Sequence, residues 1–445
     1  MVVSAFELFR IGPGPSSTHV VGPHRAAQRF VHEVAADGLL PDVHRIEIEL
    51  FGGLAYAGRE RGTDSAIIAG LTGLLVERCD SAALVQCAAR VDREGFLLLA
   101  NGPRIAFTAD RDLRFVVDRA IAFDGNAMRF VAHNRYGEVI ASRVFFSTGH
   151  GHVVGDGDRA TEAHPRLPHA YASAEAMLAA SASQRKRIVD MARANECVRF
   201  SPDEVRSGLM RIGAAMRAAL DRGLVTDGIL PSGNRRTAPS LSAALGEAKS
   251  AATGSTALAQ RASMYATAVA EESAAGGRVV AAPSAGSAGP VAALLQIRSE
   301  SAPLRYDDGV VKVLHVGSAV GGMLRAAGVA QVGCQSEIGV ASAMAAAGYA
   351  AALGASDMQI VYAADLALRP HLGLTCDPAG GGIDTVARRG RAHGRMRRLE
   401  CMRCRQGIAF DTRILDATSG RVAGKAQMGT QGQVRRIDDL HVARP

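Results

Sequence analysis

The chain has 445 residues, of which 48% are hydrophobic and 21% are charged, and its formal net charge is +8. This length and composition are typical of a globular protein with two or three domains, and they exclude an intrinsically disordered chain. Aromatic residues make up 4% of the chain, tryptophan is absent, and glycine numbers 49. So many small residues indicate closely packed helices rather than an aromatic-rich β-sandwich.

Residues 1–155 predict a mixed α/β domain. Residues 45–50 (Arg-Ile-Glu-Ile-Glu-Leu) alternate with a period of two, which predicts a half-buried strand. Helices are expected at residues 23–36 and 64–78, the second with Asp64 near its start, where a carboxylate is favourable. Further strands are expected at 96–100, 128–133 and 138–146, the last two as a hairpin.

The second half of the chain has a different character. A segment rich in Gly, His, Asp and Pro predicts a linker, placed at residues 156–182, before a mostly α-helical domain at 183–382 and a basic tail at 383–445. The fold class expected is therefore α+β, with the mixed domain first. Helices are expected at 173–181, 184–195, 202–222, 256–273, 291–298, 318–327 and 338–353.

Most of the excess positive charge lies in the tail. No aromatic side chain lies among the eight arginines between residues 388 and 405 to stack on bases. A local basic run of this kind is typical of a solvated surface, so we expect no nucleic-acid partner. The arginines are Arg388, Arg389, Arg391, Arg395, Arg397, Arg398, Arg403 and Arg405.

Three features bear on the compartment. The longest uncharged stretch, residues 338–354, is mostly Ala, Gly and Ser and is slightly too short to span a bilayer, so we expect a buried helix and no membrane partner. The first ten residues lack the apolar core of a signal peptide. Seven scattered cysteines without such a signal then indicate a reducing, cytoplasmic setting.

The loop at residues 11–19 reads Ile-Gly-Pro-Gly-Pro-Ser-Ser-Thr-His and precedes a predicted helix. Its glycines and prolines fix a turn, and Ser16, Ser17 and His19 then offer donors that could hold a carboxylate or phosphate at a helix start. The alternative is an ordinary capping loop, in which the hydroxyls satisfy free backbone N–H groups. A P-loop is excluded because no Gly-Lys-Ser/Thr follows.

A second small-residue loop, residues 276–289, contains Ser284 and Gly286. Its glycines permit close approach of the backbone to a ligand, and they equally permit tight packing of helices. Both interpretations stay open on the sequence. A dinucleotide-binding fold receives little support because no Gly-x-Gly-x-x-Gly follows a predicted strand.

Four cysteines lie in settings that suit metal ligands. Cys334 and Cys376 occupy short polar segments beside turns, and Cys401 and Cys404 form a Cys-x-x-Cys pair that could be half of a zinc or cluster site. The remaining cysteines lie in helical or apolar surroundings and are interpreted as core or surface thiols. None of the four lysines lies in a loop suited to a Schiff base, which disfavours pyridoxal phosphate chemistry.

Several of these segments together resemble the bacterial iron–sulfur L-serine dehydratases, or L-serine ammonia-lyases. The similarity runs with gaps from about residue 4 to residue 382, and its motifs occur in the family's order. The segments that carry it are residues 5–23, 62–64, 271–280, 333–339 and 372–378.

The resemblance implies an N-terminal β-containing domain and a C-terminal helical domain that holds a [4Fe–4S] cluster. Three cysteines would bind three irons, and the open fourth iron would act as a Lewis acid on the hydroxyl of L-serine. Cys334 and Cys376 match two of the ligands, and His19 is the first candidate for the base. The catalytic and substrate-binding residues implied are Ser16, Ser17, His19, Thr63, Asp64, Ser284 and Gly286.

Several positions depart from the family pattern. Ala387 stands where the third cluster cysteine is expected, so Cys401 or Cys404 would have to supply that ligand. Arg61 replaces a histidine, and Arg369 replaces a glutamate; both would add positive charge, which suits a more anionic substrate. Ser284-Ala285 replaces a Thr-Asn pair.

The resemblance implies an enzyme of amino-acid catabolism, expected to be a homodimer. Two alternatives stay open. The chain could be a diverged paralogue that acts on another small hydroxy or amino acid, or an inactive homologue that binds an amino acid. A bound cluster separates the enzymes from the binding protein.

Overall fold

The computed structural model describes residues 2–117, 126–158, 166–247, 255–326 and 334–371. The chain divides into two compact units, each described here by itself. The β unit contains residues 11–164 and 276–278, and the helical unit contains residues 1–10, 165–275 and 279–445. In the described ranges, no helix is long and apolar enough to cross a membrane.

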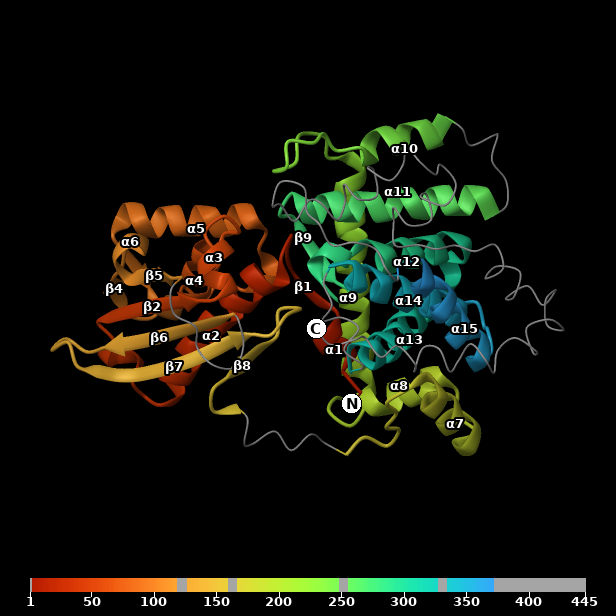
Figure 1. The fold of residues 1–445 in the computed structure, drawn as a ribbon, viewed down its shortest axis with the longest axis horizontal. Coiled ribbons are helices and arrows are strands. Elements are labelled where there is room, and N and C mark those ends of the chain that lie inside the picture. The colour runs from red at the N-terminus through yellow and green to blue at the C-terminus, as the bar shows by residue number, and fades with distance from the viewer. Residues whose placement is uncertain (1, 118–125, 159–165, 248–254, 327–333, 372–445) are drawn as a thin grey trace. The chain divides into compact units, whose positions relative to one another are not determined.

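A five-stranded sheet organises the β unit (Figure 1), with the strand order β5-β2-β6-β7-β8. Strand β2 pairs parallel with β5 and antiparallel with β6, and β6 pairs antiparallel with β7, as expected for the predicted hairpin. A separate antiparallel pair is formed by β3 and β4. The strands of these two sheets are β2 (Arg45–Phe51), β3 (Phe96–Leu98), β4 (Arg104–Ala106), β5 (Leu113–Val116), β6 (Ala127–His133), β7 (Val139–Ser147) and β8 (Val153–Gly155).

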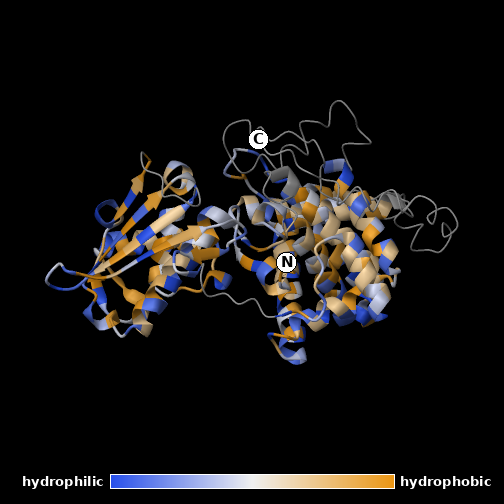
Figure 2. Ribbon diagram, turned by 60° about the horizontal axis from the view of Figure 1, so that its bottom comes forward, coloured by the Kyte–Doolittle hydropathy of each residue, from blue (hydrophilic) through white to orange (hydrophobic). Residues whose placement is uncertain are grey.

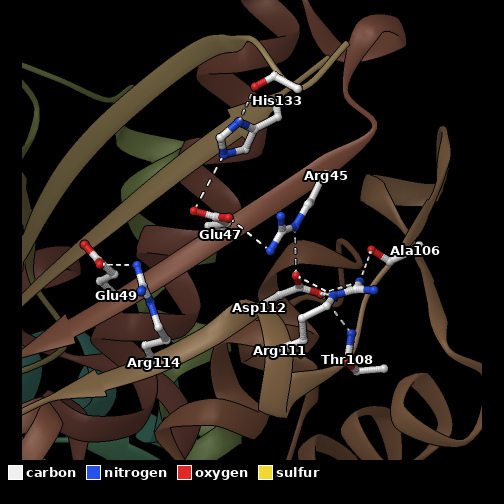
Figure 3. Close-up of polar contacts among 10 residues, drawn as sticks. Arg45, Glu47, Glu49, Ala106, Thr108, Arg111, Asp112, Arg114 and His133 are labelled. Atoms are coloured by element: carbon white, nitrogen blue, oxygen red, sulfur yellow. Dashed lines mark hydrogen bonds and ion pairs between the residues drawn. The ribbon is translucent and has the colours of Figure 1, made fainter. Parts of the chain in front are cut away.

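The two faces of this sheet differ, as the alternation in β2 predicts. Ile46, Ile48 and Leu50 are fully buried in the core of the unit. The intervening side chains form a network of charges on the other face (Figure 3). Glu49 there accepts hydrogen bonds from the guanidinium groups of Arg114, at 2.5 Å, and Arg129. Pairing across the strands thus neutralises carboxylates on the face opposite the core.

Helices cover the apolar face of the sheet. The core cluster joins α2 and α4 to the sheet through large side chains such as Phe30, Ile67 and Phe130. Amphipathic α5 packs beside α4 and begins with a side-chain cap from Asp80. The helices are α2 (Gly22–Ala36), α3 (Gly53–Ala57), α4 (Thr63–Leu71), α5 (Ser81–Glu94) and α6 (Ala109–Asp112).

The helical unit is built around α14, which packs against α12, α13 and α15. Figure 2 shows hydrophobic residues over much of the helical unit. Gly348 of α14 lies so close to α13 that an added Cβ would sit 2.5 Å from the carbonyl oxygen of Val313. The helices are α1 (Ala5–Leu8), α7 (Ala174–Gln184), α8 (Ile188–Glu196), α9 (Pro202–Val225), α10 (Ala238–Glu247), α11 (Ser255–Ala274), α12 (Gly289–Ser301), α13 (Tyr306–Ala326), α14 (Cys334–Ala352) and α15 (Asp357–Leu368).

The α+β layout is confirmed, while several element boundaries differ from prediction. The helix expected at 64–78 ends at Leu71, because Gly73 adopts a positive φ of 83° that an α-helix does not accommodate. The helix expected at 318–327 begins at Tyr306, with two aspartates in its first turn. Helix α7 begins at Ala174 and confirms the helix expected at 173–181, which overlaps the segment expected as a linker. Helices α1, α3, α5, α6, α10 and α15 were not predicted.

Close contact between α9 and α11 makes Gly223 sensitive to substitution. A Cβ at this position would lie 2.2 Å from the carbonyl oxygen of Ala268. We expect Gly223→Ala to destabilise the helical unit by about 1–3 kcal/mol, measured by urea unfolding followed by circular dichroism. Gly157→Ala, whose Cβ would meet nothing within 4 Å, is the control. Equal midpoints for the two variants would contradict the tight helix contact.

Candidate functional site

The loop at residues 11–19 leads into a short π-helix, Ser17–Val21, that packs against α2 and α4. Ser16 caps this helix: its Oγ accepts the backbone N–H of His19 at 3.3 Å and lies 3.1 Å from the Nδ1 atom of the same residue. The capping interpretation of the loop therefore holds for Ser16. The interpretation as a ligand-binding loop stays open, since the same hydroxyl also contacts the imidazole.

Hydrogen bonds from two other elements fix the position of His19. The buried Thr63 hydroxyl, at the start of α4, donates to the carbonyl oxygen of His19 at 2.7 Å. The Ser147 hydroxyl at the end of β7 donates to the carbonyl oxygen of Thr18 at 2.8 Å. Thr63 was predicted to bind substrate, and the structure shows its hydroxyl engaged with the backbone of the loop.

His19 lies beside Arg61, the residue that replaces a histidine of the family pattern. The Nη1 atom of Arg61 is 3.2 Å from Nδ1 and 3.3 Å from Nε2 of the imidazole. Burial first, and the nearby cation second, lower the pKa of His19 to about 4, against a hydrogen bond with the backbone of Gly53. His19 is therefore neutral at physiological pH, and Arg61 carries the positive charge of this pair.

The other residues predicted in this region take different positions. Ser17 is buried in the π-helix. Asp64 lies in the first turn of α4, where its Oδ1 accepts the N–H of Ser65 at 2.8 Å. Gly62 precedes this helix with a φ of 74°, which a side chain would strain. Ser16, His19, Thr63 and Arg61 thus form one cluster of contacts, held between the loop and the start of α4.

The two glycine-rich segments singled out in the sequence meet in the β unit. The N–H of Gly14 donates to the carbonyl oxygen of Gly277 at 2.9 Å, and the N–H of Ser81 donates to that of Gly276 at 2.8 Å. The Ser81 hydroxyl donates to the carbonyl oxygen of Gly14 at 3.0 Å. Residues 276–278 are therefore bound to the loop that precedes Ser16, a contact that chain order alone does not predict.

Ser284 lies in the helical unit, before a short 3-10 helix that contains Gly286. Its Oγ donates to the Oε2 atom of Glu337 at 2.6 Å and lies 3.0 Å from the Oγ of Ser287. Ser273 closes the same turn by donating to the carbonyl oxygen of Ala285 at 2.7 Å. Ser284 is thus joined to a carboxyl group on α14.

Glu337 is a residue to which the sequence analysis assigned no role. Burial raises the pKa of its carboxyl group to about 7, and the hydrogen bond from Ser284 opposes that shift. The carboxyl group is therefore present in both protonation states near neutral pH. The sequence contains a feature that could have drawn attention to Glu337, because this residue directly precedes the uncharged stretch that forms most of α14.

The predicted cluster ligands fall mostly outside the described residues. Helix α14 begins at Cys334, whereas Cys376, Cys401 and Cys404 lie beyond residue 371, as does Ala387. Within the described ranges, no group of three or more His, Cys, Asp or Glu residues could hold a metal ion. Cys79 and Cys87 are buried and Cys197 is partly buried, in agreement with their interpretation as core or surface thiols.

The structure corrects the role expected of Arg369. This arginine was expected to add positive charge that suits an anionic substrate. Its Nη2 atom instead lies 2.5 Å from Oδ2 of Asp365, one turn earlier in α15. The pair is neutral, so Arg369 does not contribute the charge that the substitution alone predicted.

Comparison with known proteins places the chain in a family. A family model described as the serine dehydratase beta chain matches residues 4–158, and one described as the serine dehydratase alpha chain matches residues 170–384. The chain belongs to the serine dehydratase family. An L-serine dehydratase of Streptomyces coelicolor is 34% identical over 88% of this chain and 88% of the relative. L-serine dehydratase 2 of Escherichia coli is 35% identical over 86% of this chain and 85% of the relative.

In this family member, Arg61 is expected to depress the pKa of His19. Protonating His19 would place a second cation beside the guanidinium, so Arg61→Gln should raise the pKa of His19 above 4, while burial keeps it below 6.5. The shift can be measured by NMR titration of the ring. His24, whose pKa burial and Arg25 lower to about 4, is an internal control. An unchanged pKa of His19, or an equal shift in the pKa of His24, would contradict the contact between Arg61 and His19.

The hydrogen bond from Ser284 is expected to limit how far the pKa of Glu337 rises. A carboxyl group with a raised folded-state pKa loses its stabilising contribution as pH rises through that pKa. Ser284→Ala should raise the pKa of Glu337 above 7, so this loss extends to higher pH. Urea midpoints at pH 6 and pH 8 would measure the difference. Ser301→Ala, which removes a hydroxyl bonded to a backbone carbonyl on α12, should behave like the wild type.

Proposed function

We propose that this chain is an L-serine ammonia-lyase, which converts L-serine to pyruvate and ammonia. The observation that carries the proposal is the match of both serine dehydratase models, in order, to residues 4–158 and 170–384. Relatives with the name L-serine dehydratase align over most of their own length, 88% for the Streptomyces coelicolor protein and 85% for the second Escherichia coli protein. The match therefore covers the greater part of these proteins.

The geometry at His19 supports a role in proton abstraction. At neutral pH the imidazole is unprotonated and can accept a proton, since its pKa is lowered to about 4. Ser16 and Thr63 hold the residue through its side chain and backbone. Loss of the α-proton and of the β-hydroxyl, as water, leaves aminoacrylate, which tautomerises and hydrolyses to pyruvate and ammonia.

Cys334 is the first residue of α14, and its match to a ligand of the family pattern is the reason that we propose it as a cluster ligand. We propose Cys376 as the second ligand and either Cys401 or Cys404 as the third. When bound, a [4Fe–4S] cluster with an open iron supplies a Lewis acid for departure of the serine hydroxyl. The proposal includes a cytoplasmic location, in keeping with the seven cysteines, and a homodimeric assembly.

Cluster content and pyruvate release test this function together. The full chain, purified and reconstituted without oxygen, is expected to bind about four irons and four sulfides and to release pyruvate from L-serine. Cys334→Ser should lose both properties, whereas Cys197→Ser should keep them. Separate Cys401→Ser and Cys404→Ser variants would identify the third ligand.

Two results would favour the alternatives. A stable cluster without pyruvate from L-serine would indicate a paralogue with another small hydroxy or amino acid substrate. Absence of a cluster under every reconstitution condition, with L-serine still bound, would indicate an amino-acid-binding homologue.

A further inference from the structure

Arg61 differs from the other partly buried arginines in residues 11–158. Those of comparable burial are Arg25, Arg29, Arg129 and Arg143. Each of these four forms an ion pair with a carboxylate. Arg61 forms no ion pair with any described residue, although removing a cation from water without a partner is unfavourable.

The contact with His19 leaves most of the hydrogen-bonding capacity of Arg61 unused. A guanidinium group has five N–H donors in a planar fork. The contacts of Arg61 to the imidazole involve one atom, Nη1, which is almost equally far from both ring nitrogens. Such a position does not align with the in-plane lone pair of either nitrogen. The Nε and Nη2 donors therefore have capacity for another acceptor.

The surroundings of the guanidinium favour an anion. Ser16 and His19 are neutral, so the cluster they form with Arg61 carries one positive charge. The two nearest acidic residues along the chain are Glu60, which is exposed, and Asp64, which accepts the N–H of Ser65. Neither forms an ion pair with Arg61 in the part of the chain that the structure describes. A carboxylate fits this cluster because its two oxygens match the fork of a guanidinium group, while the Ser16 hydroxyl provides a neutral donor.

We propose that Arg61 is a substrate-binding residue that holds the α-carboxylate of the amino acid. The identity of the amino acid rests on the proposed function. The binding of a carboxylate is argued from residues of the β unit alone. It places the carboxylate beside His19, so that the neutral imidazole lies near the carbon that bears the α-proton. Arg61 would thus fix the orientation of the amino acid toward His19.

A pair of ligands that differ at the carboxylate tests the assignment. L-Alanine and L-alaninamide both lack the hydroxyl that leaves, so neither is dehydrated, and only L-alanine carries the α-carboxylate. Isothermal titration of the full chain should show preference for L-alanine. Arg61→Gln should weaken the binding of L-alanine by about ten- to hundred-fold and leave the affinity for L-alaninamide unchanged. Arg61→Lys, which keeps the charge without the fork, should give an intermediate loss.

The matched control is Arg59→Gln, which removes the same charge two residues away. Arg59 is exposed and lies over the ring of Phe115 at 5.0 Å, so it should leave the preference for L-alanine intact. Circular dichroism of both variants checks that they fold. The assignment is overturned if Arg61→Gln keeps the wild-type preference, if it weakens both ligands equally, or if the wild type shows no preference.

Two further measurements separate this inference from the proposed function. The Arg61→Gln variant should lose as much affinity for L-aspartate as it loses for L-alanine. A loss of affinity for L-aspartate alone would overturn the assignment, since Arg61 would then bind a side-chain carboxylate. If pyruvate is formed from L-serine but Arg61→Gln leaves the preference unchanged, the inference fails and the function stands. If no pyruvate is formed but the preference depends on Arg61, the function fails and the inference stands.

Discussion

The hydrogen bond from the Thr63 hydroxyl to the carbonyl oxygen of His19 determines the arrangement of the candidate site in the β unit. It joins a turn of the N-terminal loop to the start of α4, two segments more than forty residues apart in the chain. Because the hydroxyl is buried, the bond is protected from competition with water. Arg61 lies two residues before Thr63, so the same attachment brings its guanidinium group to the imidazole.

Much of the fold follows from local pattern. The period of two in residues 45–50 correctly predicts which side chains of β2 face the core, and the hairpin of β6 and β7 follows from two alternating runs around a turn. Helix boundaries were harder to predict where one glycine decides them, as Gly73 does after α4. The unpredicted α5 begins at a capping aspartate and ends at Gly95, which are local signals that the sequence contains.

The candidate site was less predictable, because its contacts are long-range. Sequence similarity selected Ser16, His19 and Thr63, yet it did not reveal that the Thr63 hydroxyl is engaged with the loop backbone. The charge of Arg61 could be noted from the sequence, whereas the absence of a carboxylate partner among the described residues required coordinates. Arg369 shows the converse, since Asp365 lies four residues earlier, in the helix that ends just before Arg369, and this spacing could be seen in the sequence.

Each of the two units includes a short segment that is distant in the chain from the rest of that unit, and this has a consequence for biosynthesis. Residues 1–10 belong to the helical unit, and residues 276–278 belong to the β unit. During translation the β unit therefore lacks part of its structure until the ribosome has synthesised α7 to α11, when Gly276 and Gly277 become available to accept the N–H groups of Ser81 and Gly14. The β unit, most of which is synthesised before the helical unit, is therefore completed only after Gly276 and Gly277 have been added. A nascent chain arrested before residue 276 would expose the backbone N–H groups of Ser81 and Gly14, which these two carbonyl groups normally accept.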